Sequence, residues 1–268
     1  MLAALGVPWL LSGCACSQKV WVERTQTLTI PATDLQSLTV ETHNGGVKVS
    51  GEADRDEISV TARIRAGGRN RESAHACLDA LEIVSEPTAD GGHRLTSRWT
   101  EPQHPDWGEQ VGFKIVAPAR LALDVSTHNG GVSVERIDGD CRLVSHNGGI
   151  KALKIGGPLF VQTHNGGINA VTSGSSVDLQ TQNGGVHLDG RGSSQLGGKV
   201  ASHNGGIRVD LGKKTATSLE CTTKNGGITC SADMTNTHHG ERHLSCDLAG
   251  GGPHLLVETH NGGIRVKQ

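Results

Sequence analysis

Histidine recurs at one fixed place in a repeated motif of this 268-residue sequence. Asn-Gly-Gly occurs eight times, and six copies have His directly before the Asn: His43, His128, His146, His164, His203 and His260. Neutral imidazoles bind zinc and copper. If successive copies stack as neighbouring strands, the rings would lie about 5 Å apart and could share a metal ion. The alternative is a solvated ladder copied by duplication, because Gln182 and Lys224 interrupt the row and it contains no carboxylate.

A second candidate metal site lies in residues 238–244. If this segment is a strand, His239, Glu241 and His243 alternate onto one face. Two imidazoles and a carboxylate are a ligand set for zinc or iron. The segment is also a degenerate copy of the Asn-Gly-Gly motif, and relaxed selection on such a copy explains the three residues equally well. The sequence therefore indicates no cofactor beyond these two candidate metal sites.

Cys221 and Cys230 lie four residues before and five residues after Asn225. Both positions face inward in the repeat described below, so the two thiols could form a disulfide if their Cα separation permits. Alternatively, both fill the core as small apolar side chains, as Cys141 does in another copy. The sequence leaves these two interpretations open.

Catalytic patterns are missing from the sequence. The acids expected to point outward occur singly and in unrelated positions: Glu41, Asp124, Asp178, Asp189 and Glu258. No Gly-Xaa-Ser-Xaa-Gly elbow, phosphate-binding glycine loop or zinc-type Cys pairing is present. Four Trp, two Phe and no Tyr leave few platforms for sugars, and 25 basic against 27 acidic residues give no nucleic-acid footprint. We therefore expect a protein that is not an enzyme and does not bind nucleic acid.

The elements that must position these side chains follow from the repeat. Its Asn residues are Asn44, Asn129, Asn147, Asn165, Asn183, Asn204, Asn225 and Asn261. Two residues before each Asn stands Thr or Ser, and four before stands Val, Leu or Cys. Three residues after it stands Val or Ile, and five after it another apolar residue. This alternation on both sides of the motif predicts two half-buried strands joined by a sharp corner.

The same residue types recur at the same positions of every copy, and this constancy favours stacked coils over separate hairpins. Strands stacked at about 4.8 Å place like residues above one another, so Asn amides and Thr hydroxyls can form hydrogen-bonded ladders. Asn and Gly tolerate positive φ, which explains a tight corner. A self-similar period of 18 to 21 residues is typical of solenoids. We predict an all-β, single-stranded β-helix-like β-solenoid of about nine short coils, counting the degenerate copy.

Residues 51–122 interrupt the repeats and predict an N-terminal β meander. Alternation over Ile58–Ile64 indicates a strand, and Asn70–Leu81 could form one short helix. Leu81–Val84 and His93–Trp99 flank a Gly-rich turn as a hairpin would. The solenoid domain is expected over 26–268, with regular repeats over 123–268.

The N-terminus carries an export signal. Leu2–Leu11 is apolar but too short to span a bilayer, and it leads into Leu11-Ser12-Gly13-Cys14, which resembles the lipobox of bacterial lipoproteins. The resemblance implies a signal peptide over 1–13, lipid attachment at Cys14 and a tether over 14–25. No Lys or Arg precedes the apolar run, which departs from the usual leader. We expect an exported, lipid-anchored protein of the outer membrane or periplasm-facing envelope, with the membrane as its partner through the anchor.

The order of elements resembles a known family. An N-terminal strand, a β meander ending near Ala117-Pro118-Ala119 and a run of Val-Thr-Asn-Gly-Gly coils are similar to the bacterial putative-adhesin family of β-solenoid domains of unknown function, over residues 26–267. The resemblance implies a fold like that of pectin lyases without their catalytic residues, and a role in adhesion or envelope interaction. The corner histidines depart from the family. A metal-binding envelope protein and a carbohydrate-active β-helix enzyme are the alternative functions.

Overall fold

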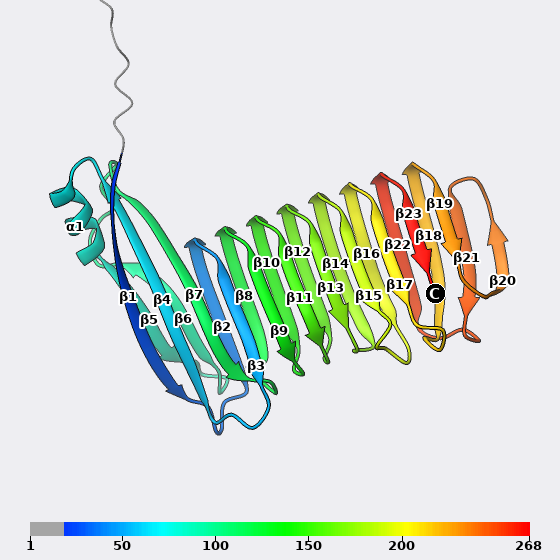
Figure 1. The fold of residues 1–268 in the computed structure, drawn as a ribbon, viewed down its shortest axis with the longest axis horizontal. Helices are drawn as coiled ribbons and strands as arrows, with labels where there is room; N and C mark the ends of the chain where they lie inside the picture. The colour runs from blue at the N-terminus through cyan, green and yellow to red at the C-terminus, as the bar shows by residue number, and fades with distance from the viewer. Residues whose placement is uncertain (1–18) are drawn as a thin grey trace, which may run out of the picture.

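The computed structural model describes residues 19–268, and the expected signal peptide and Cys14 lie outside the described residues. The described chain is all-β apart from one helix, and it forms two large sheets that face each other along an elongated body (Figure 1). In residues 19–268 no helix has the length and apolar character needed to cross a membrane.

The first sheet has eleven strands. In spatial order they are β1 (Val20–Pro31), β4 (Glu57–Gly68), β7 (Gly108–Pro118), β3 (Val47–Glu52), β9 (Val132–Ile137), β11 (Ile150–Ile155), β13 (Ile168–Thr172), β15 (Val186–Gly190), β17 (Ile207–Leu211), β23 (Ile264–Lys267) and β19 (Ile228–Ser231). From β7 to β19 every pair is parallel, whereas β1, β4 and β7 pair antiparallel.

The second sheet has twelve strands. In spatial order they are β5 (Leu81–Pro87), β6 (His93–Trp99), β2 (Ser37–Asn44), β8 (Ala122–Asn129), β10 (Cys141–Asn147), β12 (Leu159–Asn165), β14 (Ser176–Asn183), β16 (Gly197–Asn204), β22 (His254–Asn261), β18 (Thr217–Asn225), β21 (His243–Leu248) and β20 (Met234–His239). The pairs from β6 to β18 are parallel, and the hairpins at the two ends are antiparallel.

Each Asn-Gly-Gly motif joins a strand of the second sheet to a strand of the first. Neighbouring copies pair in register, so that Asn147 lies opposite Asn129 on one side and Asn165 on the other. The predicted inward positions form the core: Leu143 and Val161, for example, are fully buried. The alternation in the sequence is thus confirmed as strands with one face buried between the sheets.

The glycines of the motif have a different role from the one expected. None of them has positive φ. A Cβ at Gly148, the first glycine of its copy, would lie 2.0 Å from the carbonyl oxygen of Gly130 in the neighbouring copy. Close approach of stacked backbones therefore requires the first glycine, and the corner does not use the tolerance of Asn and Gly for positive φ.

The final repeat is inserted out of sequence order. β22 lies between β16 and β18, and β23 lies between β17 and β19. This copy buries Leu255, Val257 and Val266 completely, whereas Ile228 and Cys230 of the preceding copy are only partly buried. The copy of Asn261, which has Val at both positions where the copy of Asn225 has Cys, lies in the interior, where neighbours cover it on both sides. The copy of Asn225 lies nearer the end of the stack.

The expected ninth coil is absent. Residues 237–244 instead span the end of β20, a turn and the start of β21, which form an antiparallel hairpin on the outer edge of β18. Every residue of β20 is exposed. This segment has His239 in place of the corner Asn and Arg242 in place of the apolar residue three positions later, so stacking it as a coil would lose the ladder bond and bury a charge.

The other end of the molecule is closed by the predicted meander. β4, the helix α1 (Arg71–Asp79) and the β5–β6 hairpin form where the sequence places them. Asn70 caps the helix, since its side-chain oxygen accepts a hydrogen bond from the Ser73 amide at 2.8 Å. β1 begins at Val20 and pairs along all of β4, so residues 20–25 belong to the sheet and not to the expected tether.

Candidate functional site

The eight corner asparagines form one continuous ladder. In spatial order they are Asn44, Asn129, Asn147, Asn165, Asn183, Asn204, Asn261 and Asn225. Each side-chain Nδ2 donates to the Oδ1 of the preceding Asn, at 2.7 to 2.9 Å. The structure thus brings together all eight residues that the sequence singled out.

The corner hydroxyls hold the stack from inside. Thr163 is buried, and its Oγ1 donates to the carbonyl oxygen of Gly148 in the neighbouring copy at 2.9 Å. The other copies repeat this bond. Thr42, in the first copy, donates instead to the carbonyl of Val111 in β7, at 2.7 Å. The hydroxyls therefore connect copies through the backbone and do not bond one another.

The corner histidines lie on the outside and stack. Ring centroids are 4.7 to 4.9 Å apart along His43, His128, His146 and His164, and 4.6 Å apart for His203 and His260. The imidazole lone pairs lie in the ring planes, so a metal about 2 Å from one nitrogen would be about 5 Å from the equivalent nitrogen of a parallel neighbour. Stacked rings do not offer a shared coordination site. Partial burial, Lys224 and His203 lower the pKa of His260.

The second metal candidate is not assembled. His239 ends β20, Glu241 lies in the turn and His243 begins β21, so they do not alternate on one strand as expected. His243 approaches a different carboxylate, Glu220, at 4.0 Å. In residues 19–268 no group of three His, Cys, Asp or Glu side chains is placed to hold a metal ion. The prediction failed because the turn falls inside the segment.

Three thiols gather at the end of the stack. Cys221 and Cys230 are free in this structure. Burial raises the pKa of Cys221 to about 12. Burial, followed by the neighbouring Cys230, raises the pKa of Cys246 to about 11, and burial also raises the pKa of Cys230. The sequence missed Cys246 because it expected no antiparallel strand there.

Two of the outward acids of the second sheet, Asp124 and Glu41, are paired with arginines. Asp124 and Asp178 stand in one row, separated by Arg142 and Phe160, which stack at 4.7 Å. Arg142 lies 3.6 Å from Asp124. The pKa of Asp124 is raised by burial, although Arg142 opposes the shift. Glu41, on the neighbouring strand, is bound by Arg94 at 2.6 Å.

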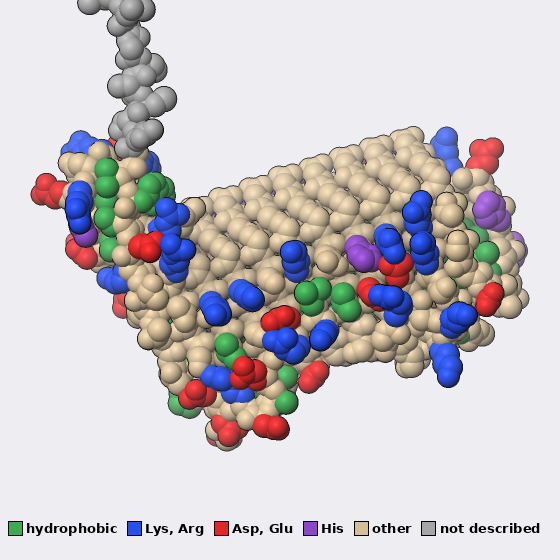
Figure 2. Space-filling model, in the orientation of Figure 1, with side chains coloured by type: hydrophobic (Ala, Val, Ile, Leu, Met, Phe, Trp, Pro, Cys, Tyr) green, Lys and Arg blue, Asp and Glu red, His purple; other side chains and the backbone are tan. Residues whose placement is uncertain are grey.

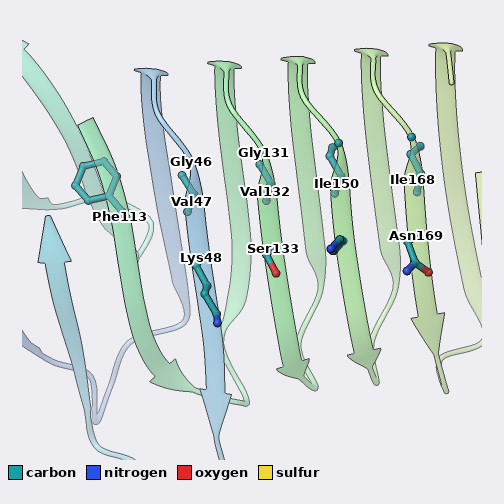
Figure 3. Close-up of a pocket in the computed structure, with 13 residues that line it drawn as sticks. Gly46, Val47, Lys48, Phe113, Gly131, Val132, Ser133, Ile150, Ile168 and Asn169 are labelled. Carbon is teal, nitrogen blue, oxygen red and sulfur yellow. The ribbon is translucent and has the colours of Figure 1, made fainter. Parts of the chain in front are cut away.

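An open groove lines the first sheet directly beside the corners. Its floor is the second glycine of each motif, and its side is a row of outward residues that includes Lys48, Lys151, Arg208 and Arg265. Figure 3 shows Lys48 of this row beside Gly46 of the floor. Sequence reasoning had identified this row only as the polar position between two apolar ones. The sequence gave no signal that these side chains become neighbours, because the order of the strands in the sheet decides that.

No family model matches the chain, and no curated protein matches it. Among solved structures, a "putative cell adhesion protein" from Clostridium sporogenes is 14% identical, with 92% of this chain and 100% of that one covered and a TM-score of 0.36. A "putative adhesin" from Bacteroides fragilis is 9% identical, with 91% and 97% covered and a TM-score of 0.41. One from Parabacteroides distasonis is 9% identical over 91% and 97%, with a TM-score of 0.34. All three of those proteins are described as adhesins or as cell adhesion proteins.

Proposed function

We propose that this chain is a non-enzymatic, lipid-anchored interaction module of the cell envelope, built as a two-sheet β-solenoid. The observation that supports it most is the unbroken ladder of eight Asn side chains. Such a ladder favours a stiff rod, while the outward rows on both sheets vary in chemistry from copy to copy. A rigid scaffold with variable outward rows suits binding.

The absence of catalysis is part of this proposal. A glycosidase needs two carboxylates about 5 to 10 Å apart that are free to act on a sugar. Asp124 and Asp178 are three strands apart, which is about 14 Å. Asp124 and Glu41 are closer, but each has its own arginine. If Asp124 and Glu41 were a catalytic pair, the unmodified chain would cleave a polysaccharide and Asp124→Asn would abolish that cleavage. We expect no cleavage by the unmodified chain.

The anchor is tested by fatty-acid labelling. The full chain is expressed in a Gram-negative host with an alkyne-tagged fatty acid, and its membrane fraction is collected. We expect labelled, membrane-bound protein, and unlabelled protein for Cys14→Ser. Cys16→Ser is the matched control, since it removes a thiol two residues away and should keep the label. Label that survives Cys14→Ser, or that never appears on the unmodified chain, would remove the anchor from the proposal.

A further inference from the structure

A row of nine outward side chains follows the first sheet from β7 to β19. In spatial order this basic row is Lys114, Lys48, Ser133, Lys151, Asn169, His187, Arg208, Arg265 and Thr229. It holds five Lys or Arg, one His and no carboxylate. From Lys114 to Arg265 it covers seven strand-to-strand steps, or about 34 Å. Figure 2 looks onto this face and shows the band of Lys and Arg below the smooth surface of the corners.

Most of these cations lack a partner. In the part of the chain that the structure describes, Lys114, Lys48, Lys151 and Arg265 have no carboxylate oxygen within 4.0 Å. Arg208 is paired with Asp210 at 2.8 Å, and His187 contacts the same carboxylate at 2.9 Å. The strands of the repeats carry their acids two positions further from the corner, in a parallel row: Glu135, Asp189 and Asp210. Glu135 and Asp189 are paired with arginines outside the basic row, whereas Asp210 is bound by Arg208 and His187 of the row, so four unpaired cations remain on the row.

The basic row borders a groove. Two open stretches of about 650 and 500 Å³ lie end to end beside the corners, and together they run along β3, β9, β11, β13, β15, β17, β23 and β19. Figure 3 shows Lys48, Ser133 and Asn169 in line along one stretch, next to the exposed glycines. The groove is therefore long, narrow and basic along one side.

Stacking of the backbones requires the first glycine of each motif but leaves room for a side chain at the second, which forms the floor of the groove. A Cβ on a first glycine would clash with a neighbouring carbonyl at about 2 Å, but a Cβ on the second glycine Gly149 would meet only the Gly167 oxygen, at 3.4 Å. At Gly227 it would meet nothing within 4 Å. All eight copies nevertheless keep the second glycine, while the basic row beside it has diversified. The floor continues at Gly112, inside strand β7, where no corner exists.

We propose that this groove binds a linear anionic polysaccharide, with its carboxylates against the basic row and its sugar rings over the glycines. The proposal deepens the proposed function and rests on it, because it names the envelope partner of the rod. One sugar ring is about as long as one strand step, so successive carboxylates can follow the row in register. Several weak, exposed contacts along one polymer add up through multivalency.

A single-stranded nucleic acid fits this groove less well. Such strands bind through bases stacked on aromatic side chains. The groove holds one aromatic residue, Phe113, and that side chain is buried at one end. A polyuronate needs no aromatic platform, because its carboxylates can pair with the Lys and Arg side chains of the basic row.

The test measures binding of the full chain, in a non-ionic detergent, to immobilised alginate. We expect binding at low salt that weakens steeply as salt approaches about 0.2 M, because the contacts are exposed charges. The triple variant Lys48→Gln, Lys151→Gln, Arg265→Gln should bind at least tenfold more weakly. The matched control is Lys213→Gln, Lys214→Gln, Lys224→Gln, which removes the same charge away from the groove and should bind like the unmodified chain. All six side chains are exposed, so both variants should unfold at nearly the unmodified temperature.

Three results would overturn the proposal: no alginate binding by the unmodified chain at low salt, equal loss in the two triple variants, or binding to oligo(dT) as tight as to alginate. Dextran, which is neutral, should not bind. Fatty-acid labelling at Cys14 is independent of the groove. Loss of the polysaccharide result with intact labelling would remove this proposal alone, whereas loss of labelling with intact polysaccharide binding would remove the anchor alone.

Discussion

Individual corner residues contribute unequally because their surroundings differ. The Asn ladder is on the surface, whereas the Thr and Ser hydroxyls beneath it are buried. Water can replace a lost amide partner at the surface, but it cannot reach a buried carbonyl left without its donor. The ladder therefore aligns the copies, and the hydroxyls hold them together.

Replacing Asn147 by Ala removes two ladder bonds, one as donor and one as acceptor. We expect a loss of about 1 kcal/mol in the free energy of unfolding, because the freed groups are exposed to water. Asn225 ends the ladder and makes only one of these bonds, so Asn225→Ala should cost about half as much. Urea unfolding of both variants measures this. Equal losses, or no loss at Asn147, would contradict a ladder that contributes bond by bond.

The pKa of His260 gives a pH prediction. Burial, Lys224 and His203 disfavour its charged form, so its pKa in the folded chain lies below the ordinary value of about 6.5. The neutral ring is favoured by folding, and this contribution is complete above pH 6.5 and is lost as pH falls through the folded-state pKa. NMR titration should show Lys224→Gln raising the pKa, and Lys213→Gln leaving it unchanged. A pKa at or above 6.5 in the unmodified chain would refute the assignment.

At the scale of strands and corners, the two glycines of one motif have different roles: the first allows close approach of neighbouring backbones, and the second leaves the groove open. Gly148→Ala places a methyl group about 2.0 Å from a backbone oxygen, so the strands must move apart, and we expect a loss of more than 3 kcal/mol or failure to fold. Gly149→Ala meets only one oxygen at 3.4 Å and should cost less than about 1 kcal/mol. Thermal unfolding of the two variants checks this. Similar losses would show that stacking, and not the open groove, explains the second glycine.

The sequence predicts these elements well and their order poorly. Period-two alternation around each Asn identifies the strands, because burial of one face imposes that pattern. All copies carry nearly the same inward residues, so each copy could pack at any place in the stack. The local sequence pattern therefore cannot show that β22 lies between β16 and β18. The His239 to His243 site failed for a related reason, since the turn of a hairpin falls within the segment.

At the scale of the whole molecule, residues at the same position of each copy lie side by side and form a row along the stack. The Asn ladder, the histidine row and the basic row each run across copies that are far apart in the sequence. The sequence shows which residue of each copy lies in the basic row, but it does not show that most charges of this row are unpaired. That depends on where Glu135, Asp189 and Asp210 lie and on the arginines that neutralise them.

The central claim is that the copies stack in parallel, in register and in this spatial order. His203 and His260 lie directly opposite each other although 57 residues separate them, whereas His203 and Lys224, from copies consecutive in the sequence, are not neighbours. The most direct measurement is disulfide formation in two double variants under mild oxidation, read by mass spectrometry of the linked peptides. We predict a bond between the new cysteines in His203→Cys, His260→Cys and none in His203→Cys, Lys224→Cys. The reverse outcome would contradict the stacking order and the rows that depend on it.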